Sequence, residues 1–159
     1  MDNNELNLYL VVVGGRIPKA NVEVHDVRWV IGCKIEDTFD DLRKNWFGSI
    51  EGLHIDSYKK IYLVDGYKIK IKESQTKKSV INPIKKGSNN KKLWFINIGG
   101  YDPKSMQEKH EFGLVVASTA SDAKKMAKSK WLHGFLKKHN DDIYCLSLIH
   151  ISEPTRRPI

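Results

Sequence analysis

The chain of 159 residues carries a net charge of +8 and has 40% hydrophobic residues, a composition that supports a packed core. No run of 18 apolar residues occurs, and the acidic, polar start lacks the basic and apolar regions of a secretory signal, so we expect neither a membrane span nor export. Cys33 and Cys145 are too few for a disulfide scaffold. Together these features predict a cytoplasmic protein with no membrane partner.

The sequence repeats itself with an offset of 85 residues. The stretch LYLVVVGGRIPKANVEVHD begins at Leu8, and LWFINIGGYDPKSMQEKHE follows at that offset. Twelve of the 49 aligned pairs are identical, and they include rare residue types such as His and Trp. We therefore predict two tandem units, residues 6–72 and 93–145, joined by a lysine-rich connector at 73–92.

In chain order, each unit reads as β-β-α-β-β. The apolar run LNLYLVVV predicts a buried strand, and we interpret Gly14-Gly15 after it as a tight turn. VEVHDVRWVIGC predicts a second strand, and LHIDSYKKIYLVDGY and KIKIKE read as extended segments after the helix. The helix is predicted from four apolar residues on one helical face: Ile35, Phe39, Leu42 and Trp46.

The second unit follows the same order, with Ser121 as the expected N-cap of its helix. The predicted fold class is α+β, with a mostly antiparallel sheet and two tandem units related by a pseudo-two-fold repeat. The second unit is expected to be incomplete, because its repeat pattern stops at Cys145.

The stretch LSLIHISEPTR, residues 146–156, matches at all eleven positions the translation of a transposase-based sequencing-library adapter. We therefore predict that residues 146–159 are a non-native tail on a truncated gene product, to be left out of functional reasoning. The composition of LSLIHI still permits a strand, for which the repeat leaves a vacant place.

The run GGRIPKANVEVHDVRWVIG, followed by IEDTFDDLRKNWFG and LHIDSYKKIYLVDGY, resembles the bacterial family called domain of unknown function 1543. Members of that family have one or two copies of the unit, so the resemblance implies a tandem two-copy member. The second unit departs from the pattern, with EKHEF in place of EVHDV and HND in place of HID. The resemblance implies no activity, cofactor or catalytic residue.

A polar set recurs in both units and forms the candidate site. In a strand, residues two apart point to the same face, so each Glu-x-His and His-x-Asp pair shares a face. Imidazole and carboxylate groups together suit a divalent metal ion, and they also suit a general base with an orienting acid. Hydrogen bonding across the sheet is the alternative that the spacing alone favours. The residues are Glu23, His25, His54 and Asp56, repeated as Glu108, His110, His139 and Asp141.

The excess positive charge is local. Residues 66–92 contain nine lysines and one glutamate, which gives +8, so the other 132 residues sum to zero. The candidate anion-binding residues there are Lys77, Lys78, Lys85 and Lys86. This stretch lacks the interleaved aromatic residues typical of a base-stacking surface, so a solvated connector is favoured over nucleic-acid binding.

Three functional hypotheses follow from the sequence. The leading one is a non-enzymatic binding or interaction module whose partner and oligomeric state are unknown. The alternatives are a metal-dependent hydrolase that uses the repeated Glu/His/His/Asp sets, and a nucleic-acid binder that acts through the connector. Whether the protein is an enzyme is left open at this point.

Overall fold

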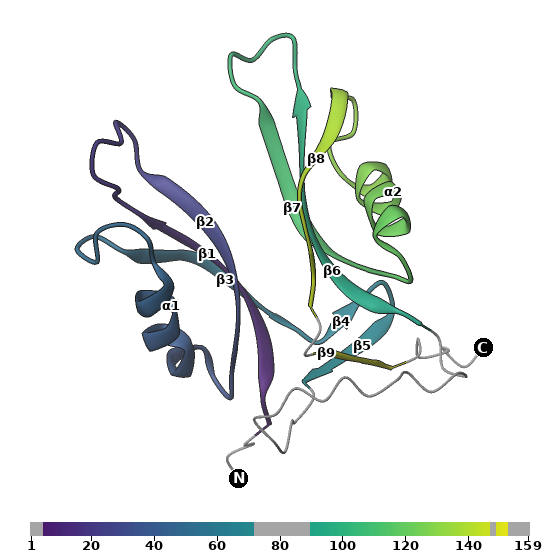
Figure 1. Ribbon diagram of the computed structural model, residues 1–159, viewed down its shortest axis with the longest axis horizontal. Coiled ribbons are helices and arrows are strands. Elements are labelled where there is room, and N and C mark those ends of the chain that lie inside the picture. The colour runs from purple at the N-terminus through teal and green to yellow at the C-terminus, as the bar shows by residue number, and fades with distance from the viewer. Residues whose placement is uncertain (1–4, 72–89, 147–148, 153–159) are drawn as a thin grey trace. The chain divides into compact units, whose positions relative to one another are not determined.

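The computed structural model describes residues 5–71, 90–146 and 149–152, and the chain divides into two compact units, residues 1–62 and 63–159 (Figure 1). All strand pairs in the described residues are antiparallel, and two helices accompany them. The expected α+β class with a mostly antiparallel sheet and two repeated segments is thus confirmed.

The first unit is a three-stranded sheet with one face covered by helix. Strand β1 (Asn7–Gly15) is central, and β2 (Val24–Gly32) and β3 (His54–Ile61) flank it. Between β2 and β3 the chain forms a 3-10 turn, η1 (Ile35–Thr38), which leads into α1 (Phe39–Asn45). The predicted helical segment is therefore helical from Ile35 to Asn45, and its first turn is wound more tightly than an α-helix. Trp46 follows the helix in an extended conformation.

The core of the first unit lies between the sheet and this helix. Alternate residues of β1 point to opposite faces, so its odd-numbered side chains meet the helix and its even-numbered ones face away. The predicted apolar helical face packs against the odd-numbered set. The buried members of this core are Tyr9, Val11, Val13, Ile35, Leu42 and Trp46, and Phe39 is partly buried against them.

The second unit repeats this arrangement. Strand β6 (Lys92–Tyr101) is central between β7 (Lys109–Ala117) and β8 (Leu136–Cys145). Helix α2 (Ala120–Lys130) covers one face. The buried core residues are Ile96, Ile98, Val115, Ala117, Ala123, Ala127 and Leu132.

Helix α2 begins two residues earlier than the sequence predicts. Thr119, in an extended conformation, is the N-cap, and its hydroxyl oxygen accepts a hydrogen bond from the backbone N–H of Asp122 at 3.1 Å. Ser121 lies inside the helix, so the prediction of Ser121 as N-cap was wrong. Both residues can cap a helix, but Thr119 directly follows β7 and its bend, where the chain is still extended.

A small hairpin follows the first sheet. Strands β4 (Leu63–Val64) and β5 (Tyr67–Ile71) are joined by Asp65-Gly66, whose φ angles of 52° and 83° match a type I′ turn. Strand β9 (Ile149–Ser152) pairs with β5 as the third strand of this sheet. The expected strand in LSLIHI is therefore present.

This hairpin belongs to the compact unit of residues 63–159. The carboxylate of Asp65 accepts a hydrogen bond from the backbone N–H of Val116 at 2.8 Å and also pairs with the ammonium group of Lys130. In the sequence, residues 63–71 end the first repeat, whereas their contacts place them with the second compact unit. The repeat boundaries at 72 and 93 stay a prediction.

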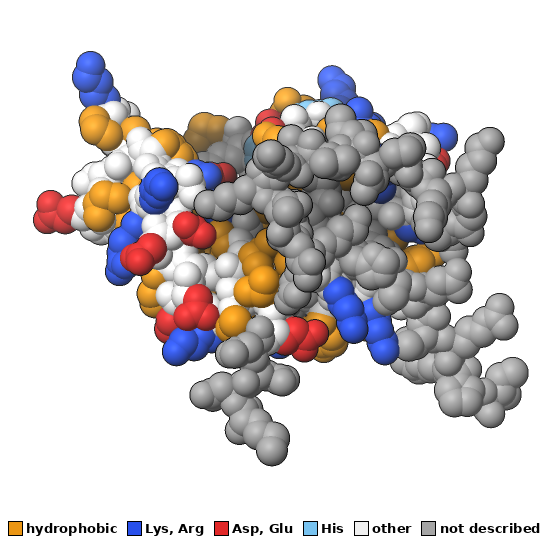
Figure 2. Space-filling view, turned by 60° about the horizontal axis from the view of Figure 1, so that its bottom comes forward, with side chains coloured by type: hydrophobic (Ala, Val, Ile, Leu, Met, Phe, Trp, Pro, Cys, Tyr) orange, Lys and Arg blue, Asp and Glu red, His pale blue; other side chains and the backbone are white. Residues whose placement is uncertain are grey.

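Acidic and basic side chains are interspersed over the described residues visible in Figure 2. This mixture agrees with the zero charge sum outside residues 66–92. Among the described residues, no helix is long and apolar enough to cross a membrane.

Candidate metal centre

The repeated polar residues come together at one end of each three-stranded sheet, on the face away from the helix. In the first unit, Gly14 of the central strand pairs with His25 on one side and His54 on the other. In the second unit, Gly99 pairs in the same way with His110 and His139. Directly paired residues of an antiparallel sheet point to the same face. Each sheet therefore carries two histidines across one glycine.

A β-bulge adds the aspartate to each row. Val12 pairs with Ser57 and Val13 pairs with Ile55, so Asp56 is an extra residue on β3. Ile55 packs into the helix-side core, which leaves Asp56 on the same face as His54. A bulge of this kind inserts one unpaired residue and turns its side chain toward a chosen face.

The second unit contains the same bulge. Asn97 pairs with Asp142 and Ile98 pairs with Asn140, so Asp141 is the extra residue on β8. The irregularity falls 85 residues after its counterpart. The two repeated segments thus share one departure from regular pairing, and in both the extra residue is an acidic candidate ligand.

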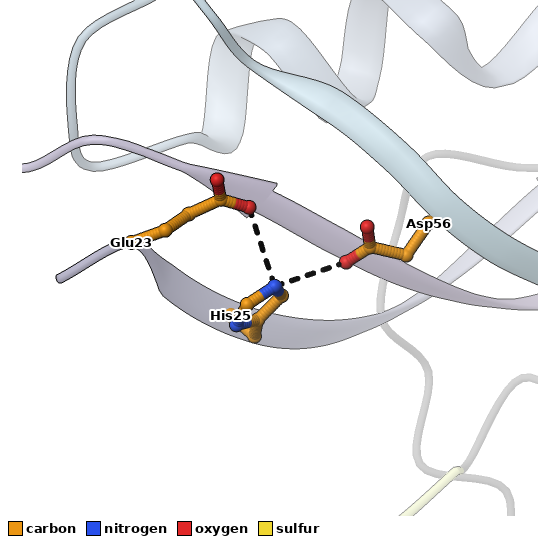
Figure 3. Close-up of side chains that lie close together, drawn as sticks. All are labelled: Glu23, His25 and Asp56. Carbon is orange, nitrogen blue, oxygen red and sulfur yellow. Dashed lines mark ion pairs between the residues drawn. The ribbon is translucent and has the colours of Figure 1, made fainter.

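In the first unit, each histidine Nε2 faces both carboxylates. His25 Nε2 lies 3.3 Å from Glu23 Oε1 and 3.3 Å from Asp56 Oδ2 (Figure 3). His54 Nε2 lies 3.1 Å from Glu23 Oε1 and 3.2 Å from Asp56 Oδ1. Figure 3 shows the carboxylates of Glu23 and Asp56 converging on the same ring nitrogen of His25. All four predicted residues of this unit are therefore brought together.

The second unit assembles the same four groups. His110 Nε2 lies 3.6 Å from Glu108 Oε2 and 3.1 Å from Asp141 Oδ2. His139 Nε2 lies 2.5 Å from Glu108 Oε1 and 2.9 Å from Asp141 Oδ1. Glu108 Oε1 is buried and has no hydrogen-bond partner among the described atoms, although it is this close to His139.

A backbone carbonyl fixes one histidine in each site. Nδ1 of His54 lies 2.8 Å from the carbonyl oxygen of Gly52, and Nδ1 of His139 lies 3.1 Å from that of Lys137. Gly52 and Lys137 occupy the same repeat position, and both have a left-handed backbone, with φ of 80° and 48°. The left-handed residue turns its carbonyl group back toward the histidine two residues later.

These contacts affect protonation. Hydrogen bonding to the Gly52 carbonyl raises the pKa of His54, with Glu23 and Asp56 contributing in the same direction against partial desolvation. Hydrogen bonding to the Lys137 carbonyl raises the pKa of His139 in the same way, helped by Asp141 and Glu108. In both sites the surroundings thus favour a positive charge at this imidazole.

Gly14 and Gly99 form the floor of the two sites. A Cβ on Gly14 would contact Glu23 Oε1 and lie 2.9 Å from His54 Nε2. A Cβ on Gly99 would contact Glu108 Oε1 and lie 2.8 Å from His139 Nε2. The side chains can therefore converge only because the central strand has no side chain there.

The sequence interpretation of Gly14-Gly15 as a tight turn was wrong, because both residues lie in β1. As neighbours in a strand, they lie beneath opposite faces of the sheet. Gly14 faces the polar site, whereas a Cβ on Gly15 would lie 2.7 Å from the Trp46 ring. The signal that could have indicated this role is the position of the glycine pair, which the repeat keeps next to the Glu-x-His strand.

Other predicted residues lie elsewhere. Trp46 is buried in the first core and Trp131 packs against the second, as the sequence predicts. A cavity of about 280 Å³ in the first unit is lined mainly by apolar side chains of the helix side and shares only His54 with the polar site. The candidate anion-binding residues Lys77, Lys78, Lys85 and Lys86 lie outside the described residues.

A solved structure is similar to the chain over almost its full length. The crystal structure of protein Il1583 from Idiomarina loihiensis is similar with a TM-score of 0.68 and 28% sequence identity, over 98% of this chain and 92% of that one. No curated protein matches.

A family model matches the chain twice. The model, described as Domain of Unknown Function (DUF1543), covers residues 20–71 and 105–151. The second match extends into the segment that we interpret as adapter-derived, so the origin of residues 146–151 stays a prediction. The two matches contain all eight residues of the polar sites, and the chain belongs to the DUF1543 family as a tandem two-copy member.

Proposed function

We propose that the protein binds divalent transition-metal ions, one in each unit, through the two histidines and two carboxylates. This proposal narrows the leading sequence hypothesis, a non-enzymatic binding module, by naming the ligand. The observation that carries it is the orientation of His54 and His139, whose Nδ1 atoms contact backbone carbonyl oxygens while their Nε2 atoms face two carboxylates.

The contact with Gly52 determines which ring nitrogen of a neutral His54 carries the proton. A carbonyl oxygen only accepts hydrogen bonds, so Nδ1 of His54 must donate. A neutral His54 therefore presents a lone pair at Nε2, and this lone pair faces carboxylates that also only accept. The Nε2 lone pair and the two carboxylates are all hydrogen-bond acceptors, so a cation has to lie between them. That cation is either a proton or a metal ion. The raised pKa of His54 expresses the same need in the metal-free protein.

The distances are compatible with a shared ion. Ligand atoms about 2.1 Å from one metal ion lie about 3.0 Å apart at a right angle and about 3.4 Å apart at a tetrahedral angle. The four N–O separations in the first site, 3.1 to 3.3 Å, fall within this interval, whereas those in the second site range from 2.5 to 3.6 Å and would have to even out around an ion. Three possible ligand atoms lie within 4.8 Å of one another in each unit, from Glu23, His25 and Asp56 in the first and from Glu108, His139 and Asp141 in the second. His54 and His110 lie outside these groups of three, so each would have to move inward to become the fourth ligand.

The ligand types indicate which ions are suitable. Imidazole nitrogen suits zinc, copper, iron and nickel, whereas magnesium, calcium and manganese prefer oxygen ligands. Carbonyl groups that orient ligating imidazoles are a common outer-shell feature of such sites. Gly52 and Lys137 supply these carbonyl groups.

The test is calorimetric titration of the metal-free chain with zinc and, separately, with magnesium. We expect two zinc ions per chain and much weaker binding of magnesium. Replacing His25 and His54 by Ala should remove one equivalent, and replacing His110 and His139 should remove the other. His133→Ala is the matched control, because His133 is exposed and belongs to neither site. Zinc binding with unchanged stoichiometry in both double variants would refute the proposal.

Metal-dependent hydrolysis is the second candidate function. It is favoured by solvent access, since the side chains of His25 and His110 are 54% and 47% exposed. Release of p-nitrophenol from p-nitrophenyl phosphate or acetate by the zinc- and manganese-loaded protein would test it. Activity has to disappear in a Glu23→Gln/Glu108→Gln variant, since activity that persists there would come from a contaminant.

A further inference from the structure

Each polar site is closed on one side by backbone. Gly14 and Gly99 lie directly beneath the converging side chains, and no additional ligand fits between the central strand and the site. The four ligands come from the flanking strands and the loop before them. An ion bound there would lie above the glycine backbone and be surrounded by these side chains.

The opposite side of each site is open to water. In the first unit the side chains of His25, His54, Glu23 and Asp56 are 34% to 54% exposed, and in the second unit their counterparts are 27% to 47% exposed. Metal sites that serve only structure are usually closed by four protein ligands and buried, whereas sites that react or exchange ligands keep an open position. The exposure places these sites in the second group.

The charge of the site suits an added anion. Two carboxylates neutralise a divalent ion, so a small anion can join without facing a net negative centre. Exposed basic residues lie at the same end of each sheet. Arg16 and Lys19 outnumber Glu51 in the loops of the first unit. In the second unit, Lys104 balances Asp102 in the loop, and Lys137 at the start of β8 adds one exposed positive charge.

We propose that the ion in each site keeps a coordination position on its solvent side that binds a small oxyanion, such as a phosphate or carboxylate group. This inference rests on the proposed metal binding and adds the ligand class. The oxyanion displaces a water molecule, and one of its oxygens becomes a metal ligand. No bond within the anion is broken in this step.

The experiment uses the full chain loaded with cobalt(II), whose visible absorption responds to a change of ligand. Azide and inorganic phosphate are the probes. We expect azide to change the cobalt bands saturably and phosphate to compete with it. If two cobalt ions bind but neither probe changes the bands, the open position is refuted while metal binding stands. If cobalt does not bind, the proposed function itself fails.

A variant tests the choice of an anion. Arg16→Ala/Lys19→Ala should weaken azide and phosphate binding to the first site several-fold at low ionic strength and leave cobalt affinity unchanged. Measurement in the background of His110→Ala/His139→Ala isolates that site. Equal anion affinity in the Arg16/Lys19 variant and in its parent would overturn the assignment of an oxyanion ligand.

Discussion

His54 donates its Nδ1–H to the carbonyl oxygen of Gly52 at 2.8 Å, and this contact decides what the other nitrogen of the ring can do. The ring cannot turn to place a neutral N–H toward the carboxylates without losing the carbonyl contact. The left-handed backbone at Gly52, which is not itself a residue of the polar site, therefore determines which nitrogen of His54 faces the carboxylates without a proton. Lys137 adopts the same conformation in the second unit, although a lysine has no intrinsic preference for it.

The first prediction concerns pH and the metal-free protein. The pKa of His54 and of His139 is raised in the folded state. Their contribution to the free energy of unfolding is therefore fully present below the ordinary histidine pKa of about 6.5, and it is lost as pH rises through the raised values. Urea unfolding of the metal-free chain should accordingly show this loss of stability across neutral pH.

Two variants test whether these two histidines cause the pH dependence of stability. A His54→Gln/His139→Gln chain should lose most of the dependence, whereas His133→Gln should keep it. An unaltered dependence in the double variant would assign the effect to other groups. Bound zinc should reverse the trend, because protons compete with the ion for the same nitrogens.

The second prediction separates the two neighbouring glycines of β1. Gly14→Ala should leave the fold intact and weaken zinc binding at the first site at least tenfold, because the new methyl group occupies the floor beneath Glu23 and His54. Gly15→Ala should instead lower the free energy of unfolding by about 1–3 kcal/mol, because its methyl group overlaps Trp46. Calorimetric titration and urea unfolding of both variants provide the comparison, and equal effects of the two substitutions on zinc binding would contradict it.

The third prediction tests the core of the second unit. Ile96 of β6 is 0% exposed in the core beneath α2. Ile96→Ala should therefore lower the free energy of unfolding by about 2–5 kcal/mol, because it removes buried apolar atoms and leaves a cavity. Met106→Ala in the same unit is the control, since Met106 is 100% exposed and its removal should change stability by less than about 0.5 kcal/mol. Similar unfolding curves for the two variants would show that the packing against α2 contributes little.

The fourth prediction concerns the carboxylate of Asp65. Asp65→Ala leaves the Val116 N–H without its acceptor and Lys130 without its partner, and should cost about 1–3 kcal/mol. Asp40→Ala is the comparison, because Asp40 is 99% exposed and its pair with Arg43 is solvated, so a change below about 0.5 kcal/mol is expected. Faster hydrogen exchange of the Val116 amide in the Asp65 variant would report the local loss directly, and unchanged exchange would argue against the contact.

Much of this arrangement could be predicted from the sequence. The 85-residue repeat is visible in the aligned identical residues. Hydrophobic periodicity predicts the apolar strands and the helical face at Ile35, Leu42 and Trp46, because each element has to bury one face. The shared face of Glu23 with His25, and of His54 with Asp56, follows from strand geometry once the strands are placed.

The remainder depended on contacts between distant residues. Which strands flank Gly14 is set by sheet order, which the local sequence does not encode. The bulge at Asp56 is visible only in the pairing with Val12 and Val13. The placement of residues 63–71 with the second compact unit follows from the tertiary contacts of Asp65, and a repeat alignment has no information about them.

The bulge also has an evolutionary consequence. Asp56 is the one residue of β3 in this row that has no partner on β1, so deletion of its codon would leave His54 opposite Gly14 and Ser57 opposite Val12 in an uninterrupted ladder. A relative that lost this codon would keep its sheet and lose one carboxylate ligand. The sheet and the polar site therefore depend on separable positions, and in each unit the bulge adds a carboxylate that the pairing of the strands does not require.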